Sequence, residues 1–333
     1  DRVLPKVMVL GHALPHPKEI FNLVSEESPP VADRPDVDGD TWKDDVDLTH
    51  LPSEKRDAIY QLLGKHRHMW DGRLGRVHAT EHRIDLNPGS KPVHAQPYRA
   101  GPRAREMETQ EVYRMLKAGV IEPASTEWAS PVVLVPKPDG TMRFCVDYRK
   151  LNEMTIRDTY PLPRMDECID SLGNARIFST LDCNCGYWQI PLAAGDTDKT
   201  TFTCHEGTYR FLRMPFGLRN APATFQRTVD IVLSGLKWKT CLVYLDDIIV
   251  FSNTEYDHFR HLEEVLSLLY GAGLSLKLTK CHFFKDTVDY LGHVIRPGKL
   301  EVAVKNTEAL RNARPPVNQT ELRSFLGLCN VYR

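Results

Sequence analysis

The sequence lacks the features that would place it in a membrane or outside the cell. No apolar run is long enough to span a bilayer. The first residues also lack the charged and then apolar pattern of a secretory signal. None of the eight cysteines forms a Cys-x-x-Cys pair, which disfavours a zinc ribbon. Several cysteines lie inside apolar runs, as small buried hydrophobic residues do. We therefore expect no membrane contact and a reducing, intracellular environment.

The chain also lacks a large net charge, with a formal value of -1 over 333 residues. The charges are distributed unevenly. Residues 25–47 hold nine acidic and two basic residues, a net charge of -7, which leaves about +6 for the rest of the chain. A mildly basic body suits a phosphate-backbone partner, although an ordinary solvated surface would carry the same charge.

The arrangement of the segments predicts an α+β protein. Residues 1–50 are rich in proline and aspartate and have little periodicity, so we expect a linker that is mostly disordered. Residues 51–90 have the pattern of a helix followed by an extended arm. Beyond them, strand-like and helical runs follow each other without strict alternation, which favours α+β over a parallel α/β fold. The chain begins with Asp1 and not with methionine, so we expect it to be a piece of a longer protein.

Two adjacent carboxylates, Asp246 and Asp247, lie between two apolar runs typical of buried strands. A hairpin built from these runs would hold both carboxylates at its turn. Paired carboxylates beside a buried sheet repel each other and lose hydration, so they need a compensating charge. Mg²⁺ is a natural one because hard cations take oxygen ligands. By itself, the motif is equally compatible with a solvated Asp-Asp turn.

A third carboxylate favours the metal site. Asp182 ends another apolar, strand-like run, residues 176–182. Alone, this aspartate would more often be a helix N-cap. Three carboxylates at the ends of neighbouring strands, however, are suited to a two-metal site for in-line phosphoryl displacement.

At this point the sequence resembles a known family. Tyr-Leu-Asp-Asp at residues 244–247 is similar to the catalytic box of reverse transcriptases, and the surrounding blocks are similar to those of gypsy-class long-terminal-repeat retrotransposons. The resemblance runs from about His82 to the end of the chain, and a series of ordered blocks is far more specific than the box alone. The blocks are residues 128–137 (WASPVVLVPK), 143–152 (RFCVDYRKLN), 160–163 (YPLP), 214–218 (MPFGL), 220–226 (NAPATFQ) and 290–293 (YLGH).

The resemblance implies a right-hand polymerase architecture with an antiparallel palm sheet. Fingers are expected at residues 91–155 and 192–215, palm at 156–191 and 216–303, and the start of a truncated thumb at 304–333. The implied activity is RNA-directed DNA polymerisation, in which a primer 3′-hydroxyl on an RNA or DNA template is extended with dNTPs. The implied cofactors are two Mg²⁺ ions, with Mn²⁺ as a substitute. Related elements carry protease, ribonuclease H and integrase domains in the same polyprotein, and act in a cytoplasmic particle or the nucleus.

The resemblance also assigns roles to individual residues. Asp182 and Asp246 would hold both metal ions, with Asp247 alongside and the main-chain carbonyl of Cys183 as a further ligand. Four residues would contact the dNTP. Lys137 and Arg143 would meet the triphosphate, where charge builds up; Tyr187 would exclude a 2′-hydroxyl; and Phe216 would pack beside the nucleotide. Without the resemblance, the bases would be ordinary surface residues and the two rings ordinary core residues.

Further blocks would hold the nucleic acid. Residues 291–293 resemble a loop that holds the primer end, and residues 220–226 would lie beneath the template. Basic residues near the C-terminal half would follow the phosphate backbone, or simply be solvated: Lys277, Lys280, Lys285, Arg296 and Lys299.

Two alternatives stay open. A decayed retroelement fragment would bind nucleic acid without copying it; the truncated thumb, and Trp188 in place of a more usual polar residue, favour this. An RNA-dependent RNA polymerase is disfavoured by Tyr187, because such an enzyme needs room for the 2′-hydroxyl.

Overall fold

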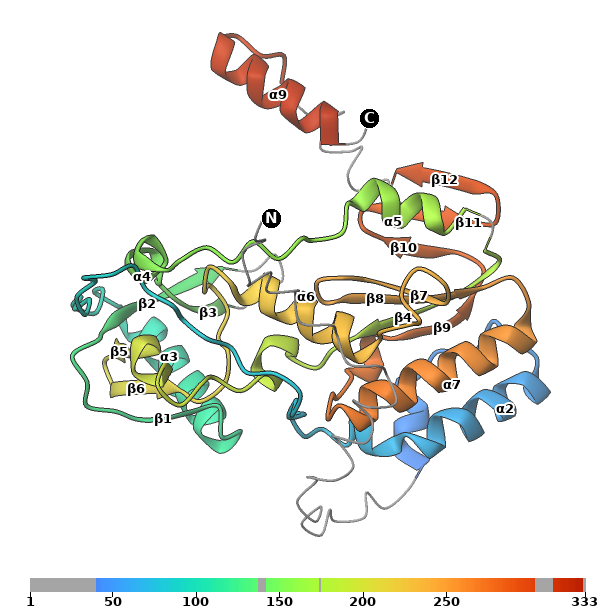
Figure 1. The fold of residues 1–333 in the computed structure, drawn as a ribbon, viewed down its shortest axis with the longest axis horizontal. Coiled ribbons are helices and arrows are strands. Elements are labelled where there is room, and N and C mark those ends of the chain that lie inside the picture. Colours follow the sequence, from blue (N-terminus) through green and yellow to red (C-terminus); the bar gives the residue numbers. More distant parts are fainter. Residues whose placement is uncertain (1–39, 137–141, 174, 303–313, 332–333) are drawn as a thin grey trace, which may run out of the picture.

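The structure, a computed structural model, describes residues 40–136, 142–173, 175–302 and 314–331. Its strands form three sheets, and helices pack around them (Figure 1). The mixture of helices and largely antiparallel sheets confirms the predicted α+β class. Among the described residues, no helix is both long enough and apolar enough to cross a membrane.

The five-stranded sheet has the order β1-β6-β5-β2-β3. Its strands are β1 (Ile121–Pro123), β2 (Ser130–Pro136), β3 (Met142–Val146), β5 (Phe202–Cys204) and β6 (Gly207–Phe211). All neighbours are antiparallel except β2 and β5. Helix α3 (Pro102–Lys117) contacts β1 and β3 and buries Val112 and Met115, and its first residue, Pro102, is well suited to that position. The short helix α4 (Arg149–Met154) follows β3.

The four-stranded sheet has the order β7-β8-β4-β9, and all its neighbours are antiparallel. The strands are β4 (Ile177–Asp182), β7 (Cys241–Tyr244), β8 (Asp247–Ser252) and β9 (His282–Lys285). Helix α7 (Glu255–Gly271) packs against β4 and β8, α2 (Ser53–Lys65) lies beside α7, and α6 (Ala221–Val232) contacts β7 (Figure 1). Residues 248–250 of β8 are all buried, as expected for a strand with packing on both faces.

A small third sheet continues the chain. It contains β10 (Val288–Tyr290), β11 (His293–Arg296) and β12 (Lys299–Val302), and helix α5 (Met165–Ser171) belongs to the same region (Figure 1). A second hydrophobic cluster joins this sheet to the four-stranded one through Phe178, Leu242 and Ile249. The short 3-10 helices are η2 (Arg67–Trp70), η3 (Gly186–Gln189), η4 (Thr197–Thr200) and η5 (Leu278–Lys280), and the last element is α9 (Gln319–Val331).

The predicted subdomains coincide with the sheets in sequence. Every strand of the five-stranded sheet lies within 91–155 and 192–215, and every strand of the other two sheets lies within 156–191 and 216–303. We call residues 91–155 and 192–215 the first lobe, and residues 156–191 and 216–303 the second lobe. Their identity as fingers and palm stays a prediction. In the thumb segment, 304–313 lies outside the described residues.

The predicted linker at residues 1–50 needs a correction. Residues 1–39 lie outside the described part, but residues 40–50 are attached to the core through η1 (Asp40–Asp45) and the buried side chains of Trp42, Val46 and Leu48. The Trp42 ring lies 5.9 Å from Tyr60 and 6.0 Å from Trp70. Three apolar side chains therefore hold this segment against the core, although its acidic composition is typical of a linker.

Candidate active site

The register of the four-stranded sheet brings the predicted carboxylates together. Asp182 is the last residue of β4 and Asp247 the first of β8, and the two are direct cross-strand partners. Asp246 precedes Asp247 in the turn between β7 and β8. The cluster predicted from two distant segments is therefore present at one end of the sheet.

The tight β7–β8 turn is held from α6. Leu245 has a φ of 53°, a left-handed conformation that costs a non-glycine residue energy. The fully buried side chain of Gln226 accepts a hydrogen bond from the Leu245 main-chain N–H at 2.8 Å and donates one to the Val243 carbonyl at 3.1 Å. This amide therefore fixes the turn that presents Asp246. The sequence prediction placed residue 226 only beneath the template.

The site is electrostatically strained. Burial, and then the charges of Asp247 and Asp182, raise the pKa of Asp246 from 3.8 to about 6, while Lys280 opposes the rise. Burial and the charge of Asp182 raise the pKa of Asp247 in the same way. Like charges brought together in a partly dry site disfavour ionisation. The carboxylates therefore favour a compensating cation.

One such cation belongs to the chain itself. The Lys280 ammonium lies 3.1 Å from Oδ2 of Asp182, from a position 98 residues further along the chain. Sequence reasoning placed Lys280 only along a nucleic-acid backbone and missed this contact. No local sequence pattern predicts this contact, because the two residues are far apart in the sequence. The main chain before Lys280 is held beside β4 by a hydrogen bond from the Lys277 N–H to the Asp182 carbonyl.

The residues present are suited to a divalent cation. Oδ1 of Asp246 is buried and has no hydrogen-bond partner among the described residues, which is costly for a carboxylate unless a cation satisfies it. As the side chains stand, however, no group of three or more His, Cys, Asp or Glu in the described ranges has the geometry to hold a metal. The donors are hard oxygens of the right type, but they are not gathered into a finished coordination shell.

Beside the carboxylates lies a cluster of rings. Tyr187, in η3, is buried and stacks on Phe216 with ring centroids 4.9 Å apart and planes 26° apart. Burial, and next the charge of Asp246, raise the pKa of the Tyr187 phenol, so this ring lies within range of the Asp246 charge. Phe216 is 48% exposed. An exposed ring supported by a buried one is a surface on which a planar ligand can pack.

The other predicted ligands are less closely placed. Cys183 directly follows Asp182, and its main chain forms an isolated bridge with Leu276; its carbonyl as a metal ligand stays a prediction. Arg143 is exposed on β3, in the first lobe. Lys137 lies outside the described residues.

The chain is similar to proteins of a known family. Residues 135–295 match the family described as reverse transcriptase (RNA-dependent DNA polymerase). The chain is 38% identical over 295 residues to the retrovirus-related Pol polyprotein from transposon 297 of Drosophila melanogaster, and 38% identical over 263 residues to that from transposon gypsy of the same species. These alignments cover 86% and 77% of the chain. The chain belongs to the reverse transcriptase family. The predicted gypsy-class resemblance is thereby confirmed.

Solved structures agree with the assignment. A foamy viral protease-reverse transcriptase in complex with double-stranded DNA matches this reverse transcriptase with a TM-score of 0.79 and 26% identity, over 88% of this chain and 52% of that one. A foamy viral protease-reverse transcriptase in complex with an RNA/DNA hybrid matches with a TM-score of 0.75 and 26% identity, over 88% and 40%. The right-hand polymerase fold is thus confirmed. The chain spans only 28% of the transposon 297 polyprotein and 25% of the gypsy one.

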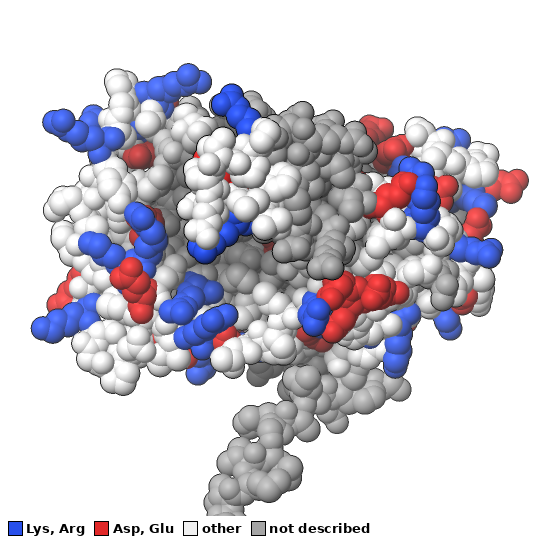
Figure 2. Space-filling view, turned by 90° about the horizontal axis from the view of Figure 1, so that it is seen from above, with Lys and Arg blue, Asp and Glu red and all other residues white. Residues whose placement is uncertain are grey.

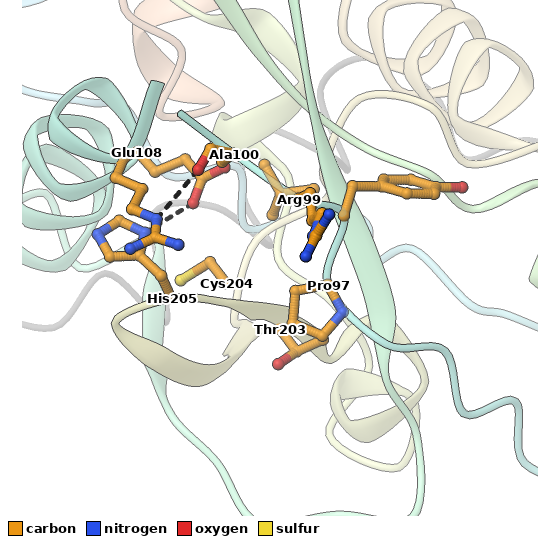
Figure 3. Close-up of a pocket in the computed structure, with 10 residues that line it drawn as sticks. Pro97, Arg99, Ala100, Glu108, Thr203, Cys204 and His205 are labelled. Atoms are coloured by element: carbon orange, nitrogen blue, oxygen red, sulfur yellow. Dashed lines mark hydrogen bonds and ion pairs between the residues drawn. The ribbon is translucent and has the colours of Figure 1, made fainter. Parts of the chain in front are cut away.

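A separate pocket of about 270 Å³ lies in the first lobe of the reverse transcriptase (Figure 3). His205 and Glu108 form one side, with Nδ1 and Oε2 2.8 Å apart, and Arg99 lies on the other side. None of the residues that line it belongs to the carboxylate or ring clusters. The pocket is therefore distinct from the candidate active site.

Proposed function

We propose that this chain extends a primer 3′-hydroxyl with dNTPs on an RNA or DNA template. The observation that carries the proposal is the pairing of Asp182 with Asp247 across β4 and β8, with Asp246 beside them in the turn and Tyr187 within range of the Asp246 charge. Family membership adds support, since the matched family is described as an RNA-dependent DNA polymerase.

We further propose that Asp182 and Asp246 hold Mg²⁺, with Asp247 and the Cys183 carbonyl alongside. Reverse transcriptases use divalent metal ions. When bound, the ions would supply positive charge to the phosphoryl oxygens and to the attacking primer oxygen. The protein's own contribution is a rigid turn, fixed by Gln226, that orients the carboxylates before any ligand binds. The partnerless Oδ1 of Asp246 supports this assignment.

The ring cluster would select the substrate. The exposed face of Phe216 would pack beside the incoming nucleotide, while the buried Tyr187 beneath it would leave no room for a 2′-hydroxyl. This favours a DNA polymerase over an RNA polymerase. Arg143 and Lys137 would meet the triphosphate from the first lobe, as the resemblance implies.

Template and primer would lie along the face shown in Figure 2. Lys and Arg side chains gather there over the first lobe, at the left, beside a hollow. Exposed bases of this lobe include Arg99, Arg103, Arg143, Arg149 and Lys150. Cations of this kind attract a phosphate backbone whatever its sequence. Because the relatives are polyproteins, we also propose that protease, ribonuclease H and integrase domains are joined to this one.

Primer extension tests the proposal. The wild-type chain is given a primer on an RNA template, Mg²⁺ and either dNTPs or NTPs, and the products are resolved on a gel. We expect extension with dNTPs, and its loss in Asp246→Asn but not in Asp170→Asn, which changes an exposed carboxylate on α5. Primer-template binding without extension would instead support the decayed-fragment alternative.

A further inference from the structure

An arginine of the first lobe lies on a ring of the second. Arg114, in the last turn of α3, places its guanidinium carbon 4.8 Å from the centroid of the Trp188 ring. Trp188 follows Tyr187 in η3 and is only 7% exposed. Because α3 packs on the five-stranded sheet, this contact joins that sheet to the residues beside the carboxylates.

The guanidinium is oriented by a neighbour on its own helix. Its Nε donates to Oε2 of Glu111 at 2.9 Å, and its Nη2 donates to Oε1 at 2.5 Å. The Arg114 side chain is 53% exposed, so this ion pair alone contributes little stability. The two-point pair instead fixes the plane of the guanidinium, which suits stacking on an aromatic face.

Trp188 is in turn part of the ring cluster. Its ring centroid lies 6.4 Å from that of Phe216, which stacks on Tyr187. Phe225 of α6 also packs against the cluster, with its ring centroid 5.5 Å from that of Tyr187. A Cβ atom on Gly186 would come within 2.9 Å of the Phe225 ring, so the main chain of η3 is seated directly on that ring.

The rings are therefore contacted from both lobes. Phe225 packs against Tyr187 from the second lobe, and Arg114 packs on Trp188 from the first lobe.

We propose that Arg114 is a positioning residue for the nucleotide. It holds Trp188, and through it Phe216 and Tyr187, in the arrangement that receives the deoxynucleotide. The inference rests on the proposed function. Since Arg114 touches neither the carboxylates nor, in this proposal, the substrate, its loss weakens nucleotide binding and leaves the chemical step unchanged. The expected signature is a higher KM at constant kcat.

The test uses steady-state primer extension with Arg114→Met, which keeps the aliphatic stem and removes the charge. We expect the KM for dNTP to rise about fivefold, equivalent to about 1 kcal/mol, with kcat within about twofold of wild type. Lys117→Met, which removes an exposed cation from the same last turn of α3, is the matched control and should leave KM unchanged. Arg114→Lys keeps a cation but loses the planar guanidinium group, so its KM should lie between those of wild type and Arg114→Met.

A double-mutant cycle tests the route through the ring. In a Trp188→Leu background, Arg114→Met should raise KM no further, because the partner is already gone. Additive effects of the two substitutions on KM would show that Arg114 does not act through Trp188. An unchanged KM in Arg114→Met would overturn the inference, whereas primer extension by the wild type would still uphold the proposed function. A wild-type chain that extends no primer would overturn both. If Trp188→Leu does not fold, the comparison of KM between Arg114→Met and Lys117→Met decides the question.

Discussion

We predict that Asp246→Asn stabilises the metal-free protein at neutral pH although it abolishes primer extension. Burial and two neighbouring carboxylates raise the pKa of Asp246 from 3.8 to about 6. A carboxyl group whose pKa is higher in the folded chain than in the unfolded chain favours folding while protonated and loses that contribution as it ionises. The wild type should therefore lose this stability as the pH rises through about 6, whereas the neutral asparagine loses none.

The size of the effect follows from the same pKa. The difference between 3.8 and about 6 corresponds to about 3 kcal/mol at most. Asp246 is partly open to solvent, which screens its charge, so we expect a gain of about 1 to 3 kcal/mol in the free energy of unfolding. For a chain of this length the gain corresponds to a rise in Tm of about 1 to 4 °C.

The assay is thermal unfolding in a metal chelator at about pH 7.5 and about pH 4, with Asp170→Asn as the control. Most of the gap between Asp246→Asn and wild type should disappear at the lower pH. Added Mg²⁺ should raise the Tm of wild type more than that of the variant, because a ligand stabilises the state that binds it. Equal or lower stability of the variant at about pH 7.5, or the same gain at both pH values, would refute the electrostatic reasoning.

Three further outcomes are expected. Gln226→Leu removes the hydrogen bond to the Leu245 N–H and leaves the turn without its buried partner. The free energy of unfolding in urea should therefore fall by about 2 to 4 kcal/mol, and primer extension should be slower. Unchanged stability would contradict the role given to this amide. Tyr187→Ala opens space at the sugar, so the ratio of ribonucleotide to deoxynucleotide incorporation should rise about tenfold or more, and an unaltered ratio would exclude the ring as the gate. His258 is buried, its pKa is lowered to about 3, and it hydrogen-bonds to Ser179 at 2.7 Å. Its contribution to stability is therefore lost as the pH falls below about 6.5, and His258→Gln should reduce the loss of stability measured between about pH 6.5 and pH 4.

The parts of the fold that sequence predicted are those encoded by local pattern. The hairpin around Asp246 follows from two apolar runs on either side of a short turn. Asp182 was predictable because it ends a strand-like run and because the family blocks fix the order of the segments. In each case neighbouring residues carry the information.

The misses are contacts between distant residues. The segment containing Trp42 is acidic as a whole. Its few apolar side chains are buried because the Trp42 ring packs beside Tyr60 and Trp70, which the local sequence does not reveal. Gln226 lies on a helix whose sequence gives no sign that its amide reaches a strand turn 19 residues away. Arg114 and Trp188 belong to different lobes, and neither position has a pattern that predicts the other.

The charge balance of the carboxylate site depends on Lys280, which is distant from the three aspartates in the sequence. Its ammonium offsets Asp182 and lowers the pKa values of Asp246 and Asp247, but it does not cancel the effects of burial and repulsion on them. The chain therefore supplies enough positive charge to keep three carboxylates together, but not enough to satisfy Asp246. Within the described residues, the Oδ1 atom of Asp246 is left buried and without a partner. A site balanced in this way is tolerable in the folded protein and still gains free energy from an added cation, as the proposed metal site requires.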